Sequence, residues 1–397
     1  MTDPTPNACS HPRPPGPEGL RIAFLGMRSL GHCAGGVETH VRELATRMAA
    51  QGNQVTAYCR SAYAADADSP PGVRVVSLPA VNTKHLEAIS HTALAVPCTA
   101  FGYDIVHIHA IGPSLLSWAP RLAGRKVVVT VHGLDFLRKK WGRAASLVLR
   151  AGAWTAGHCP HATIVVSPML QEYYRNRYGV EARYIPNGVA PPIRRPINLL
   201  ARFGVRGGDY VLYLGRLVPE KGAHHLIRAF RTLDWEGRLL VVGGTPHAED
   251  YARHLRDLAA GDPRIAFTGP LYGEAKDEAF SNARLFVLPS ELEGMPIALL
   301  EAMSFGCPSL ASDIPECVEL CRPRPAPADD AQPGPPLALT FAAGSSQALA
   351  ESLREALARN DLAALGLAAQ DHVLKEYDWD GVTSSTLGVY ADILARK

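Results

Sequence analysis

The segment 290–306 carries two carboxylates whose spacing suits binding chemistry. It follows an apolar run, 285–288, that predicts a buried strand, and Pro296 fits the first turn of a following helix. Glu293 is then expected on the loop at the carboxyl end of the strand. Glu301 is expected about one and a half turns into the helix. Both side chains can therefore border one crevice, with the helix N-terminus between them.

A helix N-terminus in this position offers free amides and a positive dipole end, which together suit a phosphate group. Carboxylates on either side are suited to accept hydrogen bonds from hydroxyls. A phosphate flanked by sugar hydroxyls describes a nucleotide sugar. An ordinary strand–loop–helix with two exposed glutamates remains the alternative from this segment by itself.

Two cations occupy a comparable loop earlier in the same half of the chain. Arg216 and Lys221 follow the apolar run 210–215 and precede a predicted helix. A diphosphate leaving group gains negative charge as its bond to a sugar breaks, and cations fixed beforehand stabilise that charge better than rearranging water. A solvated basic loop is the alternative, and it becomes the weaker one beside Glu293 and Glu301.

The loop between the first predicted strand and helix contains Gly35 and Gly36. Glycines allow the backbone to approach a ligand closely, and the helix that follows would point its N-terminus at that ligand. The glycine spacing in 31–36 differs from the dinucleotide-binding fingerprint. A plain turn is equally compatible with these two residues.

Histidines end two further predicted strands. His107 and His109 would point the same way on one strand, as in a metal-binding pair, so a His-x-His metallohydrolase is a rival interpretation. Such an enzyme normally has this pair near its first strand in a single barrel. His132, directly before Gly133, is the better site candidate, as a hydrogen-bonding group or proton carrier near a sugar hydroxyl. A structural histidine is the alternative.

Other metal signatures are weak. Asp-x-Asp occurs at 66–68 and 378–380, but neither copy follows a strong buried strand near the phosphate loop. The 8 cysteines are scattered without a Cys-x-x-Cys pair, so no zinc or redox site is predicted. We therefore expect no metal and no other cofactor.

Composition indicates an ordinary globular protein that does not bind nucleic acid. The 397 residues are 47% hydrophobic and 20% charged, with a formal net charge of +2. No apolar run approaches the roughly 20 residues that span a bilayer. Residues 1–19 are rich in proline, lack an apolar signal core and are expected to form a disordered leader. The predicted location is the cytoplasm.

One segment is strongly basic. Residues 121–150 contain eight lysines and arginines and one acid, Asp135, with Trp141 among the cations. Such a segment could contact anionic lipid headgroups or a phosphorylated acceptor. A solvated helix face is the alternative. Peripheral attachment to the inner face of the plasma membrane is therefore compatible with the sequence.

Near-continuous apolar runs alternate with helical segments along both halves, which predicts parallel sheets covered on both faces. The expected fold is α/β, with two doubly wound Rossmann-like domains that face each other across a cleft. The expected boundaries are 20–190 with a final helix at about 378–397, a linker at 191–208, and a second domain at 209–377. In such sheets ligands bind beyond the carboxyl ends of the strands. Within the first domain a helix is expected over 137–156.

Together these motifs resemble the retaining nucleotide-sugar glycosyltransferases of family four, which have the GT-B two-domain fold. The resemblance covers roughly residues 20 to 395 and departs from the family at the proline-rich loop 322–337. The matching elements are Gly35–His40, His107–His109, Val131–Gly133, Tyr184–Gly188, Leu214–Gly222, Leu240–Gly243, and Glu293 with Glu301.

The resemblance implies a role for each matched residue. Arg216 and Lys221 would hold the donor diphosphate, and Glu301 would bind the ribose. Glu293 would hold the transferred sugar together with the backbone of the next four residues. Gly35 and Gly36 would lie close to the phosphates, and His132 near the sugar and acceptor. The four residues after Glu293 are Gly294, Met295, Pro296 and Ile297.

The implied activity is transfer of a hexose-type sugar from a nucleotide-sugar donor to a hydroxyl of a glycan or lipid-linked acceptor, with retention of anomeric configuration. No metal would be required, because Arg216 and Lys221 supply the countercharge. Cell-envelope or exopolysaccharide biosynthesis is the expected context. The alternatives are a non-catalytic scaffold or coat protein of the same fold, a nucleotide-sugar epimerase, and a phosphorylase.

Overall fold

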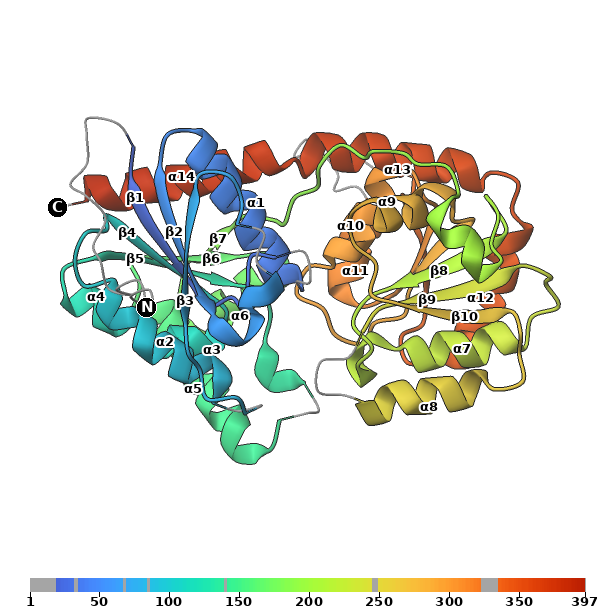
Figure 1. Cartoon of the computed structure of the whole chain (residues 1–397), viewed down its shortest axis with the longest axis horizontal. Coiled ribbons are helices and arrows are strands. Elements are labelled where there is room, and N and C mark those ends of the chain that lie inside the picture. Colours follow the sequence, from blue (N-terminus) through green and yellow to red (C-terminus); the bar gives the residue numbers. More distant parts are fainter. Residues whose placement is uncertain are drawn as a thin grey trace, which may run out of the picture. The chain divides into compact units, whose positions relative to one another are not determined.

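The chain divides into two compact units, Met1–Asn187 with Trp379–Lys397, and Gly188–Asp378. Each unit is a parallel sheet with helices on both faces (Figure 1). This arrangement confirms the predicted pair of Rossmann-like α/β domains. Most of the expected leader 1–19 and of the loop 322–337 lies outside the described residues. The computed structural model describes residues 19–31, 35–66, 69–83, 86–138, 141–244, 249–322 and 335–396.

The first unit has a seven-stranded sheet in the order β3-β2-β1-β4-β5-β6-β7, with all neighbours parallel. The strand order reverses between β1 and β4, which is where ligands bind in sheets of this kind. The strands are β1 (Arg21–Leu25), β2 (Gln54–Arg60), β3 (Val73–Leu78), β4 (Ile105–His109), β5 (Lys126–Val131), β6 (Ala162–Val165) and β7 (Arg183–Tyr184).

Helices cover this sheet because each buries one apolar stripe. Helix α1 buries Val41, Leu44 and Met48, and the last helix of the chain, α14, buries Val389 and Tyr390 in the same core. The helices of this unit are α1 (Gly36–Ala50), α2 (Glu87–Cys98), α3 (Ile111–Ser114), α4 (Trp118–Leu122), α5 (Arg143–His158), α6 (Pro168–Tyr178) and α14 (Trp379–Ala395), with 3₁₀ turns η1 (Ser61–Asp66) and η2 (Asp135–Leu137).

The helix expected over 137–156 is wrong at its start. A short 3₁₀ turn, η2, ends at Leu137, and α5 begins only at Arg143. Gly142, directly before α5, has an extended backbone (φ −70°, ψ 170°) and occupies the N-cap position. The apolar periodicity ran across this break, so the pattern did not reveal it.

The second unit has a six-stranded parallel sheet in the order β10-β9-β8-β11-β12-β13, again reversing beside its first strand. The strands are β8 (Tyr210–Leu214), β9 (Arg238–Val242), β10 (Ile265–Gly269), β11 (Leu285–Leu288), β12 (Ser309–Ser312) and β13 (Leu339–Phe341). The helices are α7 (Ala223–Arg231), α8 (Glu249–Ala259), α9 (Gly273–Asn282), α10 (Ile297–Ser304), α11 (Pro315–Cys321), α12 (Ser346–Ala358) and α13 (Leu362–Glu376), with 3₁₀ turns η3 (Leu199–Phe203) and η4 (Pro219–Lys221).

Pro296 does not lie in the first turn of α10, as the sequence predicted. It is the N-cap residue, with φ −77° and ψ 98°, and its carbonyl accepts hydrogen bonds from the Leu299 and Leu300 amides at 3.1 and 3.2 Å. The residue before a helix characteristically accepts the first helical bonds in this way. The helix therefore starts at Ile297.

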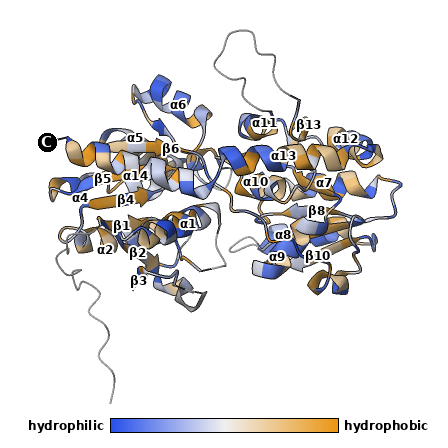
Figure 2. Cartoon of the chain, turned by 90° about the horizontal axis from the view of Figure 1, so that it is seen from above, coloured by the Kyte–Doolittle hydropathy of each residue, from blue (hydrophilic) through white to orange (hydrophobic). Residues whose placement is uncertain are grey.

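Hydrophobic residues concentrate in the strands of both sheets, whereas hydrophilic residues cover the outer faces of the helices (Figure 2). Each sheet anchors a separate core, one containing Phe24 and Ile105 and the other Val211 and Leu285. Among the described residues, no helix combines the length and the apolar character needed to cross a bilayer.

Candidate functional site

In the second unit, two neighbouring strands carry the predicted donor-site residues to one edge of the sheet. β8 pairs with β11, with Val211 opposite Leu285. The loop after β8 holds Arg216 and Lys221, and the loop after β11 holds Glu293. The site thus lies where the strand order reverses, which is the binding position in doubly wound sheets.

Lys221 and Glu293 form an ion pair in which the ammonium donates to a carboxylate oxygen. The two side chains are only 16% and 7% exposed. Their loops are also joined through the backbone, because the Glu291 amide donates to the Glu220 carbonyl at 2.9 Å. Gly222 makes this approach possible: it has φ 67°, and a Cβ there would lie 1.9 Å from the Pro289 carbonyl oxygen.

Glu301 lies on α10 and accepts a hydrogen bond from the Lys276 ammonium at 2.8 Å. Lys276 belongs to α9 and was not anticipated from the sequence. Nothing in its local pattern marks it, because the pairing depends on how α9 packs beside α10. Glu301 is thus held in place by a second cation.

The backbone just before α10 leads into the helix that carries Glu301. Met295 is buried, and the amides of Ile297 and Ala298 precede the first hydrogen bonds within the helix. These amides and the helix dipole favour an anion or a polar sugar oxygen. Ser290, two residues after β11, has a buried hydroxyl oxygen without a hydrogen-bond partner among the described residues. The sequence analysis had not singled out Ser290.

Arg216 is half-buried, and its carbonyl accepts a hydrogen bond from the Tyr213 hydroxyl at 2.9 Å. This bond anchors the start of the loop to β8. Burial raises the pKa of the Tyr213 hydroxyl well above its usual value, so the tyrosine stays a neutral donor. The Arg216 backbone is thereby fixed on the same loop as Lys221.

A polar cluster that the sequence analysis missed lies next to this loop. His225 approaches Glu291 through Nε2 at 3.3 Å and Ser346 through Nδ1 at 3.0 Å. His224 bonds the Tyr251 hydroxyl through Nδ1 at 2.8 Å, and burial lowers its pKa to about 4. The start of α7 is thus tied to the loop after β11 through Glu291, to α8 through Tyr251 and to α12 through Ser346.

In the first unit, the predicted site histidine belongs to a buried histidine cluster. His132 directly follows β5, and its Nε2 lies 3.0 Å from Nδ1 of His109 at the end of β4. The following residue, Gly133, has φ 153°, a backbone conformation that favours glycine. Both ring nitrogens of His107 form hydrogen bonds to other residues: Nδ1 lies 2.6 Å from the Tyr390 hydroxyl and Nε2 2.7 Å from the Thr130 hydroxyl.

His40, on α1, completes this cluster. Its Nδ1 bonds the Asn187 side-chain oxygen at 2.9 Å, and its ring centroid lies 4.8 Å from that of His132. Burial lowers the pKa of His40 to about 4 and lowers the pKa values of His109 and His132 well below the usual range. The cluster is therefore neutral at physiological pH. His40 and Asn187 lay within matched motifs, but the sequence had given them no role.

The residue after His109 has a strained backbone. Ala110 has φ 71° and ψ 155°, and it is the one non-glycine residue with positive φ in the described ranges. This region costs a residue with a side chain of the order of 1–3 kcal/mol, and such strain concentrates at functional sites. Gly26, after β1, contacts the same point: a Cβ there would lie 2.2 Å from the His109 carbonyl oxygen.

Gly35 and Gly36 lie at the start of α1. Gly35 is the N-cap residue, and its amide donates to the Glu38 carboxylate at 3.1 Å. Glu38 also accepts from the Arg28 amide at 3.3 Å, so it shapes the loop around the helix start. Residues 32–34, immediately before, lie outside the described part of the chain.

Two groups of described residues have ligand-type atoms within 4.8 Å of one another and could hold a metal ion. They are His40, His109 and His132, and His224, His225 and Glu291. His107, which the rival interpretation paired with His109 as a metal ligand, belongs to neither group, and both of its ring nitrogens are hydrogen-bonded. The rival His-x-His interpretation, which paired His107 with His109, is therefore not one of the candidate groups among the described residues.

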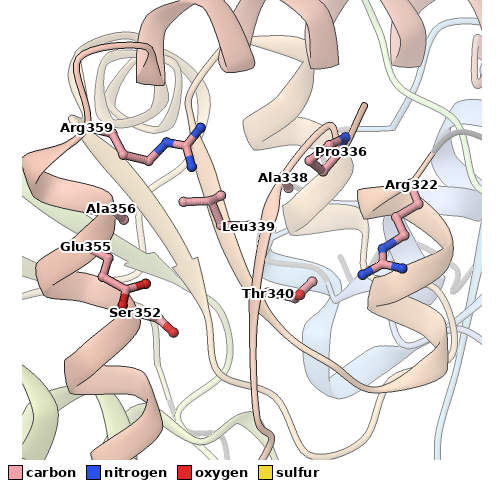
Figure 3. Close-up of a pocket in the computed structure, with 9 residues that line it drawn as sticks. All are labelled: Arg322, Pro336, Ala338, Leu339, Thr340, Ser352, Glu355, Ala356 and Arg359. Atoms are coloured by element: carbon pink, nitrogen blue, oxygen red, sulfur yellow. The ribbon is translucent and has the colours of Figure 1, made fainter. Parts of the chain in front are cut away.

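A separate cavity of about 270 Å³ lies between β13 and α12. Arg322 and Arg359 lie on opposite sides of it (Figure 3). Arg359 is paired with Asp361 at 2.6 Å. No predicted donor-site residue lines this cavity, so it is not part of the site at β8 and β11.

Comparison with known proteins identifies the class. Residues 34–191 match the family described as Glycosyltransferase Family 4, and residues 208–359 match Glycosyl transferases group 1. A phosphatidyl-myo-inositol mannosyltransferase of Mycobacterium leprae is 30% identical, over 90% of this chain and 93% of that protein. The chain is therefore a GT-B glycosyltransferase and belongs to glycosyltransferase family 4.

Solved structures share the fold. Sucrose-phosphate synthase from Thermosynechococcus elongatus aligns with a TM-score of 0.78 at 23% identity, covering 95% of this chain and 100% of that one. Anabaena Alr3699/HepE in complex with UDP-glucose aligns with a TM-score of 0.76 at 19% identity, covering 94% of this chain and 100% of that one. At these identities the likeness establishes the architecture of both units.

Proposed function

We propose that this glycosyltransferase transfers a hexose-type sugar from a nucleotide-diphosphate donor to a hydroxyl of a glycan or lipid-linked acceptor, with retention of configuration. The observation that carries the proposal is the convergence of Lys221, Glu293 and Glu301 on the loops and helix after the neighbouring strands β8 and β11. Cations for a diphosphate and carboxylates for sugar hydroxyls meet there.

The relatives support both substrates in general terms. The HepE structure is a complex with UDP-glucose, and the Mycobacterium leprae relative is named a phosphatidyl-myo-inositol mannosyltransferase. We infer a nucleotide-sugar donor and a glycan or lipid-linked hydroxyl acceptor for this chain. Cell-envelope or exopolysaccharide biosynthesis is the context that follows from such an acceptor.

We assign each residue of the second unit one task. Arg216 and Lys221 neutralise the donor diphosphate, and Glu301, held by Lys276, accepts from the ribose hydroxyls. Glu293 accepts from hydroxyls of the transferred sugar. The backbone from Gly294 to Ile297 supports the same sugar.

In the first unit, we assign the binding of the donor phosphates to Gly35 and Gly36, together with the N-terminus of α1. His132 is assigned to a hydroxyl of the sugar or acceptor. Its neutral state suits a hydrogen-bonding role.

The proposed reaction breaks the bond between the anomeric carbon and the diphosphate oxygen, and the electron pair leaves with the diphosphate. The acceptor hydroxyl attacks from the same face, and its proton passes to a phosphate oxygen. Configuration is retained because the bond forms on the face that the leaving group vacates. Arg216 and Lys221 stabilise the departing charge, so no divalent metal is required.

The test combines a donor screen with product analysis. Purified enzyme is incubated with a panel of nucleotide sugars, and released nucleoside diphosphate and the anomeric configuration of the product are measured, the latter by proton NMR. The proposal expects release from at least one donor, a retained anomer, and full activity in EDTA. Product with inverted configuration, loss of activity in EDTA, or no binding of any nucleotide sugar by calorimetry would each contradict it.

We also propose that the first unit contacts anionic lipid through a basic α5 surface, formed by Arg143, Leu147, Arg150 and Trp154. Leu147 and Trp154 are 69% and 50% exposed. The sequence from 136 to 171 has five lysines and arginines and no acid, although Arg138 pairs with Asp135 just before it at 3.0 Å. Exposed apolar side chains beside several cations are typical of segments that bind an anionic membrane surface.

Vesicle sedimentation tests this contact. The enzyme should pellet with vesicles that contain phosphatidylglycerol and stay in solution with phosphatidylcholine vesicles, and Trp154→Glu should reduce pelleting. Leu367→Glu, at an exposed leucine of the second unit, is the matched control. Equal recovery with both vesicle types would reject the lipid contact and leave the transferase proposal intact. Binding would support the proposal that the enzyme is peripheral to the inner face of the plasma membrane.

A further inference from the structure

We propose that His109 is a positioning residue for His132: it occupies Nε2 of the His132 ring, so that Nδ1 is the nitrogen presented to substrate. This inference rests on the proposed role of His132 at the sugar or acceptor. It assigns His109 no contact with substrate. Its action is on the orientation and tautomer of the neighbouring ring.

The geometry of the pair is specific. Nδ1 of His109 and Nε2 of His132 are 3.0 Å apart, and the rings stack with centroids 5.3 Å apart at 27°. His109 is fully buried, whereas His132 is partly exposed. Nδ1 of His132 makes no hydrogen bond to the described residues. It is not among their buried atoms that lack a partner, so it is not fully buried. It is therefore the ring nitrogen left for a ligand.

His109 has no other hydrogen-bonding task. Its Nε2 is buried without a partner in the described part of the chain. By contrast, His107 on the same strand uses both nitrogens, bonding Tyr390 and Thr130. The ring of His109 also contacts those of Phe24 and His107, at centroid distances of 5.5 and 4.2 Å, but these contacts use no ring nitrogen. The bond to His132 is the one hydrogen bond of the His109 imidazole among the described residues.

The backbone holds His109 in this position from both sides. The strained Ala110 follows it, and the Ala110 amide donates to the Thr130 carbonyl at 2.9 Å, tying the end of β4 to β5 two residues before His132. Gly26 packs directly against the His109 carbonyl. Backbone strain persists where the surrounding structure over-determines it, and it marks functional positions. Here it fixes the origin of the His109 side chain.

The other contact of His132 agrees with this orientation. His40 packs edge-on against the His132 ring at 80°, and its Nδ1 is held by Asn187 at 2.9 Å. The ring of His132 is therefore confined by stacking on one side and by an edge contact on another. Only its hydrogen bond to His109 distinguishes one ring nitrogen from the other.

This arrangement has a chemical consequence. With Nε2 engaged, a neutral His132 can form one hydrogen bond to a substrate hydroxyl through Nδ1, and it has no second nitrogen through which to relay a proton to solvent. The acceptor proton then goes to the phosphate oxygen of the leaving group, as the proposed reaction requires. His132 orients the hydroxyl and is not consumed or charged in the step.

Two substitutions at His109 separate positioning from packing. The side-chain amide of His109→Asn falls near the Nδ1 position and can replace the bond to His132, whereas that of His109→Gln falls near the unpartnered Nε2 position. We expect kcat/KM for transfer within about threefold of wild type for H109N and reduced by about 10–100-fold for H109Q, the range typical of residues that orient a functional group. Nucleotide-diphosphate affinity should be unchanged in both.

His91→Asn is the matched control. His91 is a buried histidine of the same unit with one nitrogen bonded, to the Cys59 carbonyl at 3.0 Å, and the other unpartnered. It should lose stability as the His109 variants do, without a loss of kcat/KM in the folded fraction. Urea unfolding of each variant corrects the rates for the folded population.

Nitrogen-15 NMR of the histidine rings gives a readout that is independent of turnover. His132 should show one tautomer in wild type and H109N, and averaged tautomers in H109Q. A single unchanged tautomer of His132 in H109Q, or wild-type kcat/KM in that variant, would overturn the proposal. If the enzyme transfers no sugar from any donor, the proposed function fails, and the tautomer measurement still decides the role of His109.

Discussion

The ion pair between Lys221 and Glu293 allows a sharp test of the donor site. In Lys221→Met the aliphatic stem is kept and the charge is removed. At about 4 Å and an effective dielectric of about 20, a lysine stabilises one unit of phosphate charge by about 4 kcal/mol. Because each 1.36 kcal/mol corresponds to about a tenfold change in rate, kcat/KM should fall roughly 10³-fold.

The same change also affects folding, because it leaves a carboxylate that is only 7% exposed without its cation. Breaking a buried pair by removing one partner typically costs about 3–5 kcal/mol, and partial exposure of Lys221 at 16% puts the expected loss near the lower end. The double variant Lys221→Met/Glu293→Gln removes the stranded charge. Its stability should recover while its transfer activity does not.

The assay measures nucleoside diphosphate release under kcat/KM conditions, with urea unfolding of each variant in parallel. Lys375→Met, at a lysine whose side chain is 82% exposed, is the matched control and should match wild type in both measurements. If Lys221→Met keeps kcat/KM within tenfold of wild type while it is folded, Lys221 does not neutralise the diphosphate. A double variant that regains activity together with stability would equally refute the reasoning.

Two further predictions concern the first unit. Ala110→Gly should raise the free energy of unfolding of this unit by about 1 kcal/mol. It relieves backbone strain of about 1–3 kcal/mol, and the entropy that a glycine loses on folding costs less than that. Urea titration, with Ala123→Gly as the control, would measure the difference. The free energy of unfolding of the first unit should also fall as the pH is lowered. The folded pKa of His40, about 4, lies below the unfolded value near 6.5, so the unfolded chain binds more protons between these values. This histidine alone should remove about 2 kcal/mol between pH 7 and 5, and His40→Gln should flatten the decline; a pH-independent unfolding midpoint would contradict the prediction.

The sequence predicted where the candidate donor-site residues of the second unit lie in the fold, because their placement depends on local pattern. Apolar runs identified β8 and β11, and the carboxyl ends of neighbouring parallel strands lie at one edge of a sheet. Arg216, Lys221 and Glu293 could therefore be assigned to one site without coordinates. The presence of Glu301 on the following helix came from the same strand–loop–helix pattern.

The partners of these residues could not be predicted, because they come from packing between distant segments. Lys276 reaches Glu301 from another helix, and His107 is bonded by Tyr390, 283 residues away. The spacing of His107 and His109, which had left a metal pair as a rival interpretation, could not show this long-range contact. Spacing along one strand shows which side chains share a face, but it does not show what the opposite layer offers them.

The ion pairs also determine how the site should distinguish a nucleotide sugar from a bare nucleoside diphosphate. In the free enzyme Lys221 is neutralised by Glu293, so a diphosphate that attracts Lys221 leaves a poorly exposed carboxylate without its partner. Hydroxyls of a bound sugar can satisfy that carboxylate, whereas a nucleoside diphosphate offers none there. Glu293→Gln removes the uncompensated charge.

We therefore expect Glu293→Gln to bind nucleoside diphosphate several-fold more tightly than wild type and to bind the nucleotide sugar more weakly, with slower transfer. Calorimetry with both ligands at one ionic strength measures the two affinities. Glu291→Gln, at the neighbouring carboxylate that faces His225, is the matched control and should change neither of the two affinities. If Glu293→Gln lowers the affinity for both ligands equally, Glu293 acts on the diphosphate through Lys221 and not on the sugar.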